Sequence, residues 1–260
     1  MRLYFRLLAA ALRARMQYKF DFVLSAVLYG MGTALDFLFV ATVLYHYKVI
    51  SGWNLYEVAL LSGVATSAFG IYRVFAAEID HFDRYLIHGE FDSVLIRPWP
   101  TLATVIAHDF DLGRIGALAQ GLLVLGIGLV GVLRQGAPAW VAGYIFLLPL
   151  AGACVLTALA VASAAAGFWL TRVGELLTFT ISAPTAAGQY PADIFPRWLR
   201  ELLTFVLPVT TFTYLPLRAA LGKGGSLSLL LLPFLVAPVA LYLSTRFWGW
   251  GERHYQSTGS

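Results

Sequence analysis

Residues 139–170 read AWVAGYIFLLPLAGACVLTALAVASAAAGFWL and contain no charged side chain. An apolar run of about 18 or more residues is long enough for a helix to cross the hydrocarbon core of a bilayer. The whole chain has the same character, with 59% hydrophobic residues, 12% charged residues and a mean hydropathy of +0.75. Soluble domains contain about 45–50% apolar and about 25% charged residues. The composition therefore excludes a soluble fold and predicts a polytopic membrane protein.

Five further apolar stretches accompany this run, and together they predict an all-α membrane protein with six transmembrane helices in one domain, residues 1–260. The six expected spans are, in chain order, Phe22–Tyr45, Leu55–Ala77, Ile115–Leu133, Ala139–Leu170, a span that begins near Leu176, and Leu227–Phe247. Six spans of about 20 residues use about 120 positions. The remaining loops are too short to hold a soluble catalytic domain.

The basic residues predict how the chain is oriented. Arg2, Arg6 and Arg13 share one side of a helix, so residues 2–19 are expected to form an amphipathic helix in the membrane interface, or alternatively a cytoplasmic extension of the first span. With the N-terminus inside, twelve Lys and Arg residues fall on the cytoplasmic side and six on the other. Because cytoplasmic loops are enriched in Lys and Arg, both termini are expected in the cytoplasm. The net charge of +4 is attributed to contact with membrane lipid and not with nucleic acid.

Prolines interrupt the apolar stretch between the fifth and sixth spans. Pro191, Pro196, Pro208 and Pro216 divide it into short pieces. Broken helix at membrane depth is tolerated where protein or a water-filled cavity covers the freed backbone groups. We expect external re-entrant helices over 184–216; a seventh span at about 202–221 is the alternative.

The chain carries no catalytic motif. The only Gly-Lys pair, Gly222-Lys223, lacks the upstream glycine of a phosphate-binding G-x-x-x-x-G-K-[ST] loop. Two Asp/His clusters, residues 80–83 and 108–111, do not predict a metal site, because neighbouring residues of a helix point about 100° apart. Any energy for transport must then come from a partner or an ion gradient.

Asp36 lies near the middle of the first expected span. A carboxylate at this depth costs a few kcal/mol on insertion scales, so it is expected to face other helices, a cavity or a second subunit. Two interpretations stay open: a site on the substrate or proton path, and a hydrogen-bonded residue of helix packing.

Residues 78–97 form the most informative polar loop. Ile79, Phe82 and Leu86 make a short apolar stripe, Gly89 is typical of a helix end, and Arg97 precedes a proline. The stretch holds five acidic and two basic residues. This pattern favours a short amphipathic helix that docks a cytoplasmic partner, or alternatively an ordinary loop helix packed on the membrane.

Three stretches resemble a bacterial family of type-2 ABC transporter permeases. LIHGEFDSVLIRPWP (residues 86–100) is similar to the family's G-x-x-D-x-x-L-x-R-P stretch, and the ending WGWGERHYQSTGS (residues 248–260) is similar to its Gly-x-Arg-x-Tyr-x-Ser-x-Gly tail. FPRWLRELLTFVLPVTTFTYLP (residues 195–216) agrees as well. The resemblance covers essentially the whole chain.

The resemblance implies a non-catalytic permease subunit of an ABC exporter in the bacterial plasma membrane. Such a subunit pairs with a second permease, identical or homologous, and sits on two copies of a separate ATPase that binds ATP and Mg²⁺. Residues 78–97 would act as the coupling helix and 184–216 as the external gate. No cofactor is expected in this chain.

The residues expected to act in this way fall into three groups. Those expected at the ATPase contact are Gly89, Glu90, Phe91, Asp92 and Arg97; those at the external gate are Gln189, Tyr190 and Pro191; and Asp36 is expected on the translocation path or at the dimer interface. The expected cargo is hydrophobic or amphiphilic. The alternatives are a proton-coupled transporter that uses Asp36, and an intramembrane lipid head-group transferase, for which a metal-holding acidic motif is missing.

Overall fold

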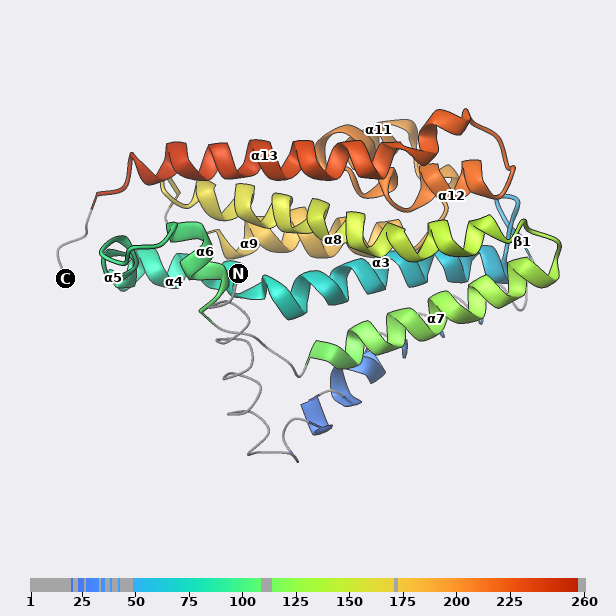
Figure 1. Ribbon diagram of the computed structural model, residues 1–260, viewed down its shortest axis with the longest axis horizontal. Helices are drawn as coiled ribbons and strands as arrows, with labels where there is room; N and C mark the ends of the chain where they lie inside the picture. Colours follow the sequence, from blue (N-terminus) through green and yellow to red (C-terminus); the bar gives the residue numbers. More distant parts are fainter. Residues whose placement is uncertain are drawn as a thin grey trace.

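Long helices running side by side form the body of the molecule in the computed structural model (Figure 1). The structure describes residues 20, 23–25, 27–32, 34, 35, 38, 42, 49–108, 114–170 and 173–256. The long helices are α3 (Leu55–Phe75), α7 (Ile115–Arg134), α8 (Trp140–Ala166) and α13 (Leu232–Glu252). The shorter elements are, in chain order, β1 (Val49–Ile50), β2 (Trp53–Asn54), η2 (Ala77–His81), α4 (Phe82–Ile87), α5 (Glu90–Leu95), α6 (Thr101–Ile106), α9 (Gly174–Leu177), η4 (Thr178–Ser182), α10 (Ala183–Gly188), η5 (Ala192–Ile194), α11 (Arg197–Glu201), η6 (Leu202–Val206), η7 (Val209–Thr211), α12 (Tyr214–Ala220) and η8 (Leu227–Leu230).

A tight hairpin starts helix α3. β1 and β2 pair antiparallel, and Ser51 and Gly52 between them both have positive φ, as a two-residue type I′ turn requires. The side chain of Asn54 then accepts from the N–H of Glu57, whose carboxylate accepts from the N–H of Asn54. This reciprocal capping box satisfies two backbone donors that a helix start leaves open.

Glycines allow α3 and α7 to approach closely. A Cβ atom on Gly63 would lie 2.5 Å from the Cα of Leu125, and one on Gly128 would lie 2.8 Å from the backbone N of Leu60. Gly70 and Gly121 are equally crowded against the facing helix. Small residues at such a contact let two membrane helices pack backbone against backbone.

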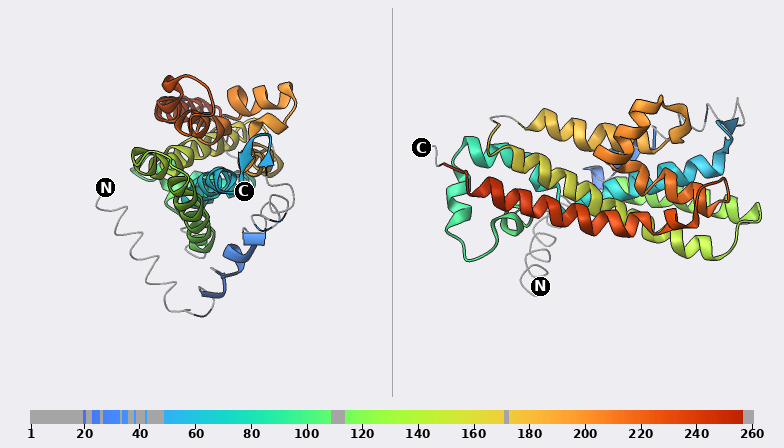
Figure 2. Two further views of the ribbon diagram at one scale, coloured as in Figure 1. Left: turned by 90° about the vertical axis from the view of Figure 1, so that its right-hand side faces the viewer. Right: turned by 90° about the horizontal axis from the view of Figure 1, so that it is seen from above.

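Figure 2, looking along the bundle, shows the long helices in the order α13, α8, α3, α7. α3 and α8 occupy the middle, and most of their residues are buried, including the small residues Ala158, Ala160 and Ala164 of α8. α7 and α13 lie outside and keep large apolar side chains exposed. That exposure fits a bundle whose outer surface faces lipid or another subunit.

Three helices of the described part, α3, α7 and α8, are long and apolar enough to cross a membrane. They coincide with the predicted second, third and fourth spans. A bent pair, Arg197–Val206 with Val209–Ala220, raises the number to four if it counts as one broken span. The total of six spans stays a prediction.

The predicted fifth and sixth spans have different boundaries in the structure. α9, η4 and α10 form a run from Gly174 to Gly188 that includes a π-helical turn. α13 begins at Leu232 and not at Leu227, because Leu227–Leu230 form a separate 3-10 turn and Pro233 is suited to the first turn of the helix.

The alternative of a seventh span over 202–221 does not appear as one continuous helix. The chain breaks at Leu207 and Pro208, and the two halves of the bent pair are inclined at 78°. A proline lacks the N–H that an uninterrupted helix needs and clashes with the preceding turn. This geometry is that of a broken span or a re-entrant segment.

The described positions of the predicted first span, among them residues 27–32, are helical. Gly30 passes the carbonyl of Gly116 at the start of α7, where a Cβ atom would lie 3.2 Å from that oxygen. Asp36 and residues 2–19 lie outside the described residues, so the predictions about them stay untested.

Candidate functional site

Polar and aromatic side chains gather at the two ends of the bundle. One end holds the loop segment, defined here as residues 77–106, together with the end of α8 and the end of α13. The opposite end holds the β-hairpin and the bend region, defined here as residues 189–225 (Figure 1). The loop segment and the end of α13, which the charge count assigns to the cytoplasmic side, therefore share one end of the molecule.

The loop segment is a series of short helices: the predicted short helix before Gly89 corresponds to η2 and α4, while α5 and α6 after it were not predicted as separate helices. η2 and α4 end before Gly89, which has φ +68°, and α5 follows directly. Glycine adopts a positive φ at little steric cost, so Gly89 lets the chain turn between α4 and α5. The predicted stripe faces inward: Ile79 and Phe82 are fully buried and Leu86 is half-buried.

An aromatic cluster fixes the loop segment to the long helices. Its members are Phe82 of α4, Phe91 of α5, Phe168 just after α8, Trp248 of α13 and Tyr255 beyond α13. The ring centroids of Phe91 lie 5.4 Å from Phe168 and 4.9 Å from Tyr255, and those of Phe82 and Trp248 lie 4.6 Å apart. Tilted and edge-to-face aromatic pairs contribute about 0.5–1.5 kcal/mol beyond their burial. The cluster therefore connects three distant parts of the chain.

The predicted contact residues divide into two groups in the structure. The charged side chains of Glu90, Asp92 and Arg97 are exposed at this end. Phe91 has no exposed surface and lies inside the aromatic cluster. The arrangement can present charges to a partner while Phe91 anchors the helix that carries them.

The side chain of Arg84 bridges the break between α4 and α5. Its guanidinium donates to Glu78 at 2.9 Å and lies 3.7 Å from the carboxylate of Glu90. Tyr85 also donates to Glu78, at 2.8 Å. Burial, and then the bond to Glu78, raise the pKa of Tyr85 well above its ordinary value. At the end of α3, Tyr72 and Arg73 both donate to Asp80.

A second set of hydrogen bonds joins α6 to α13. Trp248 donates its indole N–H to the hydroxyl of Thr101 at 3.1 Å, and this hydroxyl donates to Glu252 at 2.9 Å. Burial, followed by the nearby carboxylate of Asp92, raises the pKa of Tyr255 above its ordinary value. Two of the motifs that carry the family resemblance, around Asp92 and around Tyr255, are thus neighbours in space.

The opposite end is organised around Asp193, which follows Pro191 in the bend region. Its carboxylate accepts from the hydroxyl of Tyr214 at 2.6 Å and from the indole of Trp53 at 3.4 Å, and it lies 4.0 Å from Arg200. Arg218 donates to the Tyr214 hydroxyl at 3.1 Å. One carboxylate therefore ties the hairpin to both halves of the bent pair.

The three predicted gate residues lie at this end. Gln189 accepts from the hydroxyl of buried Ser62 on α3, at 3.2 Å. Tyr190 is half-buried against the apolar core, and Pro191 is buried. Their contacts hold the bend region against the end of the bundle.

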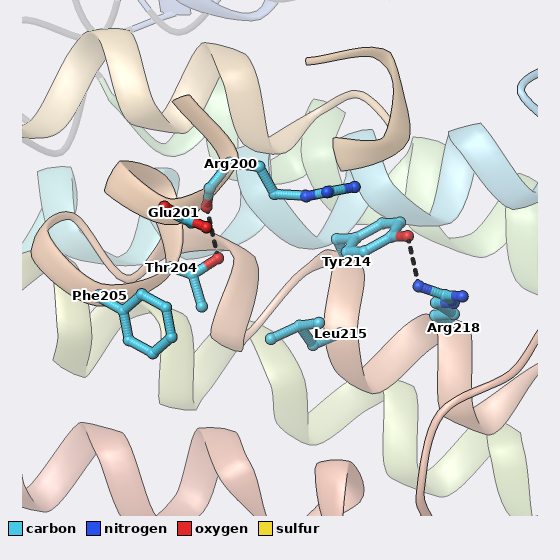
Figure 3. A pocket seen from close by; sticks show the side chains of 7 residues that line it. All are labelled: Arg200, Glu201, Thr204, Phe205, Tyr214, Leu215 and Arg218. Atoms are coloured by element: carbon cyan, nitrogen blue, oxygen red, sulfur yellow. Dashed lines mark hydrogen bonds between the residues drawn. The ribbon is translucent and has the colours of Figure 1, made fainter. Parts of the chain in front are cut away.

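A pocket of about 320 Å³ opens between the two halves of the bent pair (Figure 3). Its lining consists of Arg200, Glu201, Thr204, Phe205, Tyr214, Leu215 and Arg218. Figure 3 shows the guanidinium groups of Arg200 and Arg218 near the hydroxyl of Tyr214, while Phe205 and Leu215 line the other part. The pocket thus has a basic side and an apolar side.

Sequence reasoning missed Trp248, Phe168 and Asp193 as structural centres. Trp248 belongs to a stretch that carries the resemblance, but nothing in the linear sequence shows that it meets Phe82. Asp193 could have been identified from the sequence, because it is an acidic residue in an apolar, proline-rich stretch. In the described residues no three His, Cys, Asp or Glu side chains converge as metal ligands would.

The comparisons with known proteins agree with this architecture. The family model described as ABC-2 family transporter protein matches residues 31–259. No curated protein matches the chain.

Proposed function

This chain belongs to the ABC-2 transporter family, and from that premise we propose that it is the permease subunit of an ATP-driven exporter. Permeases of this family are membrane components that are not themselves catalytic, and they generally work with ATPase subunits. The family and the apolar helices make this chain a multi-pass membrane protein. The direction of transport, the nature of the cargo and the composition of the complex are our proposals.

The aromatic cluster is the observation that carries the proposal. α5 presents Glu90 and Asp92 to solvent while Phe91 of the same helix is buried against Phe168 and Tyr255. A displacement of α5 by a partner is therefore passed directly to the ends of α8 and α13. Close-packed groups transmit such displacements because the interior has few voids.

In the proposed complex, two ATPase copies bind ATP and Mg²⁺ and each contacts one permease at Glu90, Asp92 and Arg97. The second permease is a copy of this chain or a homologue. Closure of the ATPase pair would draw the loop segments together and rearrange the two permeases. Gln189, Tyr190 and Pro191 would then form part of the gate at the far end.

The proposed orientation places both termini and the loop segment in the cytoplasm of a bacterial cell, with the bend region outside the plasma membrane. It rests on the distribution of basic residues, twelve on one side and six on the other. The proposed cargo is hydrophobic or amphiphilic and passes between facing permeases, along the first, second and fifth spans. Asp36 is proposed to lie on this path or at the dimer interface.

The test is to express the chain with the ATPase encoded beside it and to measure co-purification, ATP hydrolysis and transport in proteoliposomes. Asp92→Asn and Arg97→Gln are expected to lower transport per ATP hydrolysed by about tenfold, because charge-assisted contacts contribute about 1.5–3 kcal/mol. Asp83→Asn is the matched control: it removes the same charge from α4 of the same loop segment, outside the proposed contact.

Two results would overturn the proposal. The first is that Asp83→Asn uncouples as strongly as Asp92→Asn, which would reduce the effect to loss of loop charge. The second is transport by this chain alone, driven by a pH gradient without ATP, which would favour a proton-coupled transporter.

A further inference from the structure

The pocket of the bend region combines two cations with an apolar wall. From its lining we infer that it binds a phospholipid with a net negative charge, the headgroup phosphate lying between Arg200 and Arg218 and an acyl chain along Phe205 and Leu215. The volume of about 320 Å³ lies in the range of about 300–1,000 Å³ that small-molecule sites occupy. The binding itself is independent of the proposed transport.

The two guanidinium groups are held in place by partners that leave donors free. Arg218 donates through Nε to the carbonyl of Lys223 and through one NH group to Tyr214. A guanidinium has five N–H donors, so the remaining ones can reach a ligand. The 4.0 Å contact of Arg200 with Asp193 likewise leaves most of its donors for the pocket. Arginine binds phosphate through two parallel hydrogen bonds, which suits it to this role.

The charges around the pocket leave an excess of one positive charge. Three guanidinium groups, of Arg197, Arg200 and Arg218, face two carboxylates, of Asp193 and Glu201. Glu201 is occupied by Arg197 at 2.8 Å, and Asp193 by Tyr214 at 2.6 Å. Asp193 also lies 4.0 Å from Arg200, so among the described residues Arg218 is the one of these three guanidinium groups left without a carboxylate at salt-bridge distance, and an anion would complete the balance.

The apolar wall continues onto the outer surface of the bundle. Phe205 is 81% exposed and its neighbour Val206 is 62% exposed. Trp198 of α11 is exposed as well. Such a surface is unfavourable in water and favourable against acyl chains, and tryptophan prefers the depth of the headgroups. A free anion would use the arginines but leave this wall without a role.

The experiment is native mass spectrometry of the full chain in a neutral detergent, titrated with three probes. Dioctanoyl phosphatidylglycerol carries the phosphate and the chains, dioctanoyl glycerol carries the chains alone, and inorganic phosphate carries the anion alone. We expect phosphatidylglycerol to bind at least about tenfold more tightly than either, because each charge-assisted contact contributes a factor of about ten or more.

The variants separate the pocket from general surface charge. Arg200→Gln is expected to weaken phosphatidylglycerol binding by about tenfold, while Arg134→Gln, which removes an exposed guanidinium at the end of α7 outside the pocket, should change it by less than about twofold. Phe205→Ala should weaken binding of the lipid but not of inorganic phosphate. Arg200→Lys serves if Arg200→Gln fails to fold, and is expected to bind with intermediate affinity because lysine keeps the charge but not the two-pronged geometry.

Three outcomes would overturn the inference. Equal weakening by Arg134→Gln and Arg200→Gln would mean that the surface potential, and not the pocket, attracts the lipid. Equal affinity for dioctanoyl glycerol would remove the role of the phosphate, and equal affinity for inorganic phosphate would make this a free-anion site. No ATP or ATPase enters the measurement, so failure here leaves the proposed transport standing, and failure of transport leaves this result standing.

Discussion

The ring centroid of Phe82, in the first turn of α4, lies 4.6 Å from that of Trp248, near the end of α13. Both side chains are almost completely buried. This contact brings the loop between the second and third predicted spans against the last helix of the chain. It also explains why residues 86–100 and residues 248–256, which are far apart in the sequence, meet at this end of the bundle.

Phe91→Ala is expected to destabilise the loop segment by about 3–5 kcal/mol, because it leaves a cavity inside the aromatic cluster. Phe91→Leu, which keeps most of the volume, is expected to cost less. Ile96→Ala is the control, since Ile96 is 85% exposed and should change stability by about 0.5 kcal/mol or less. Thermal unfolding in detergent ranks the three variants by stability. Equal unfolding midpoints for Phe91→Ala and Ile96→Ala would contradict the packing role of Phe91.

Thr101→Val is expected to destabilise the protein by about 1–3 kcal/mol, since it leaves the indole N–H of Trp248 and the carboxylate of Glu252 without their shared partner. Thr104→Val removes a hydroxyl from the same helix, but that hydroxyl only donates to the carbonyl of Pro100 nearby. Its cost should be clearly smaller. Chemical denaturation monitored by tryptophan fluorescence provides the comparison, and a larger loss in Thr104→Val would argue against a link between α6 and α13.

Apolar runs and helix-stop residues were sufficient to predict where three of the four long helices lie. α3, α7 and α8 fall within a few residues of the predicted spans, because an apolar stretch of this length with few charges has few other options in a membrane. Gly89 was predicted as a helix end and has the left-handed backbone that this role requires. Both inferences depend only on local chemistry.

The site was harder to predict, because its contacts join distant segments. The sequence suggested Phe91 as a residue that contacts a partner, yet the structure buries it, since α8 and α13 supply Phe168 and Trp248 to cover it. A helix end was expected at Gly89, but the sequence did not predict α5 beyond it or that the turn lets α5 pack onto the cluster. The hydrophobic period and the charges within residues 78–97 do not show which distant residues will cover Phe91.

Gly63→Ala is expected to destabilise the bundle by about 1–3 kcal/mol or more, because the new Cβ atom would lie 2.5 Å from the backbone of Leu125. The apolar composition of α3 and α7 predicted two spans but not that their glycines face each other. Gly126→Ala is the matched control on α7: a Cβ atom there would meet no atom of another element within 4 Å, so alanine should be neutral or stabilise by up to about 1 kcal/mol. Thermal unfolding in detergent separates the two, and a tolerated Gly63→Ala would contradict close α3–α7 packing.

Tyr255 provides a test at alkaline pH. Burial and the carboxylate of Asp92 raise its pKa in the folded protein above the value of 10.0 expected for an isolated tyrosine. Between these two values the unfolded chain has lost the proton and the folded chain has kept it, so the stability contributed by the neutral hydroxyl is complete below pH 10 and is lost as the pH rises through the folded-state pKa. Tyr255→Phe is expected to flatten this part of the pH–stability curve, and Asp92→Asn to shift the titration of Tyr255 toward lower pH. The difference in tyrosinate absorbance between the wild-type chain and Tyr255→Phe follows the single group, and ionisation at or below the ordinary pKa would contradict the proximity of Asp92 and Tyr255.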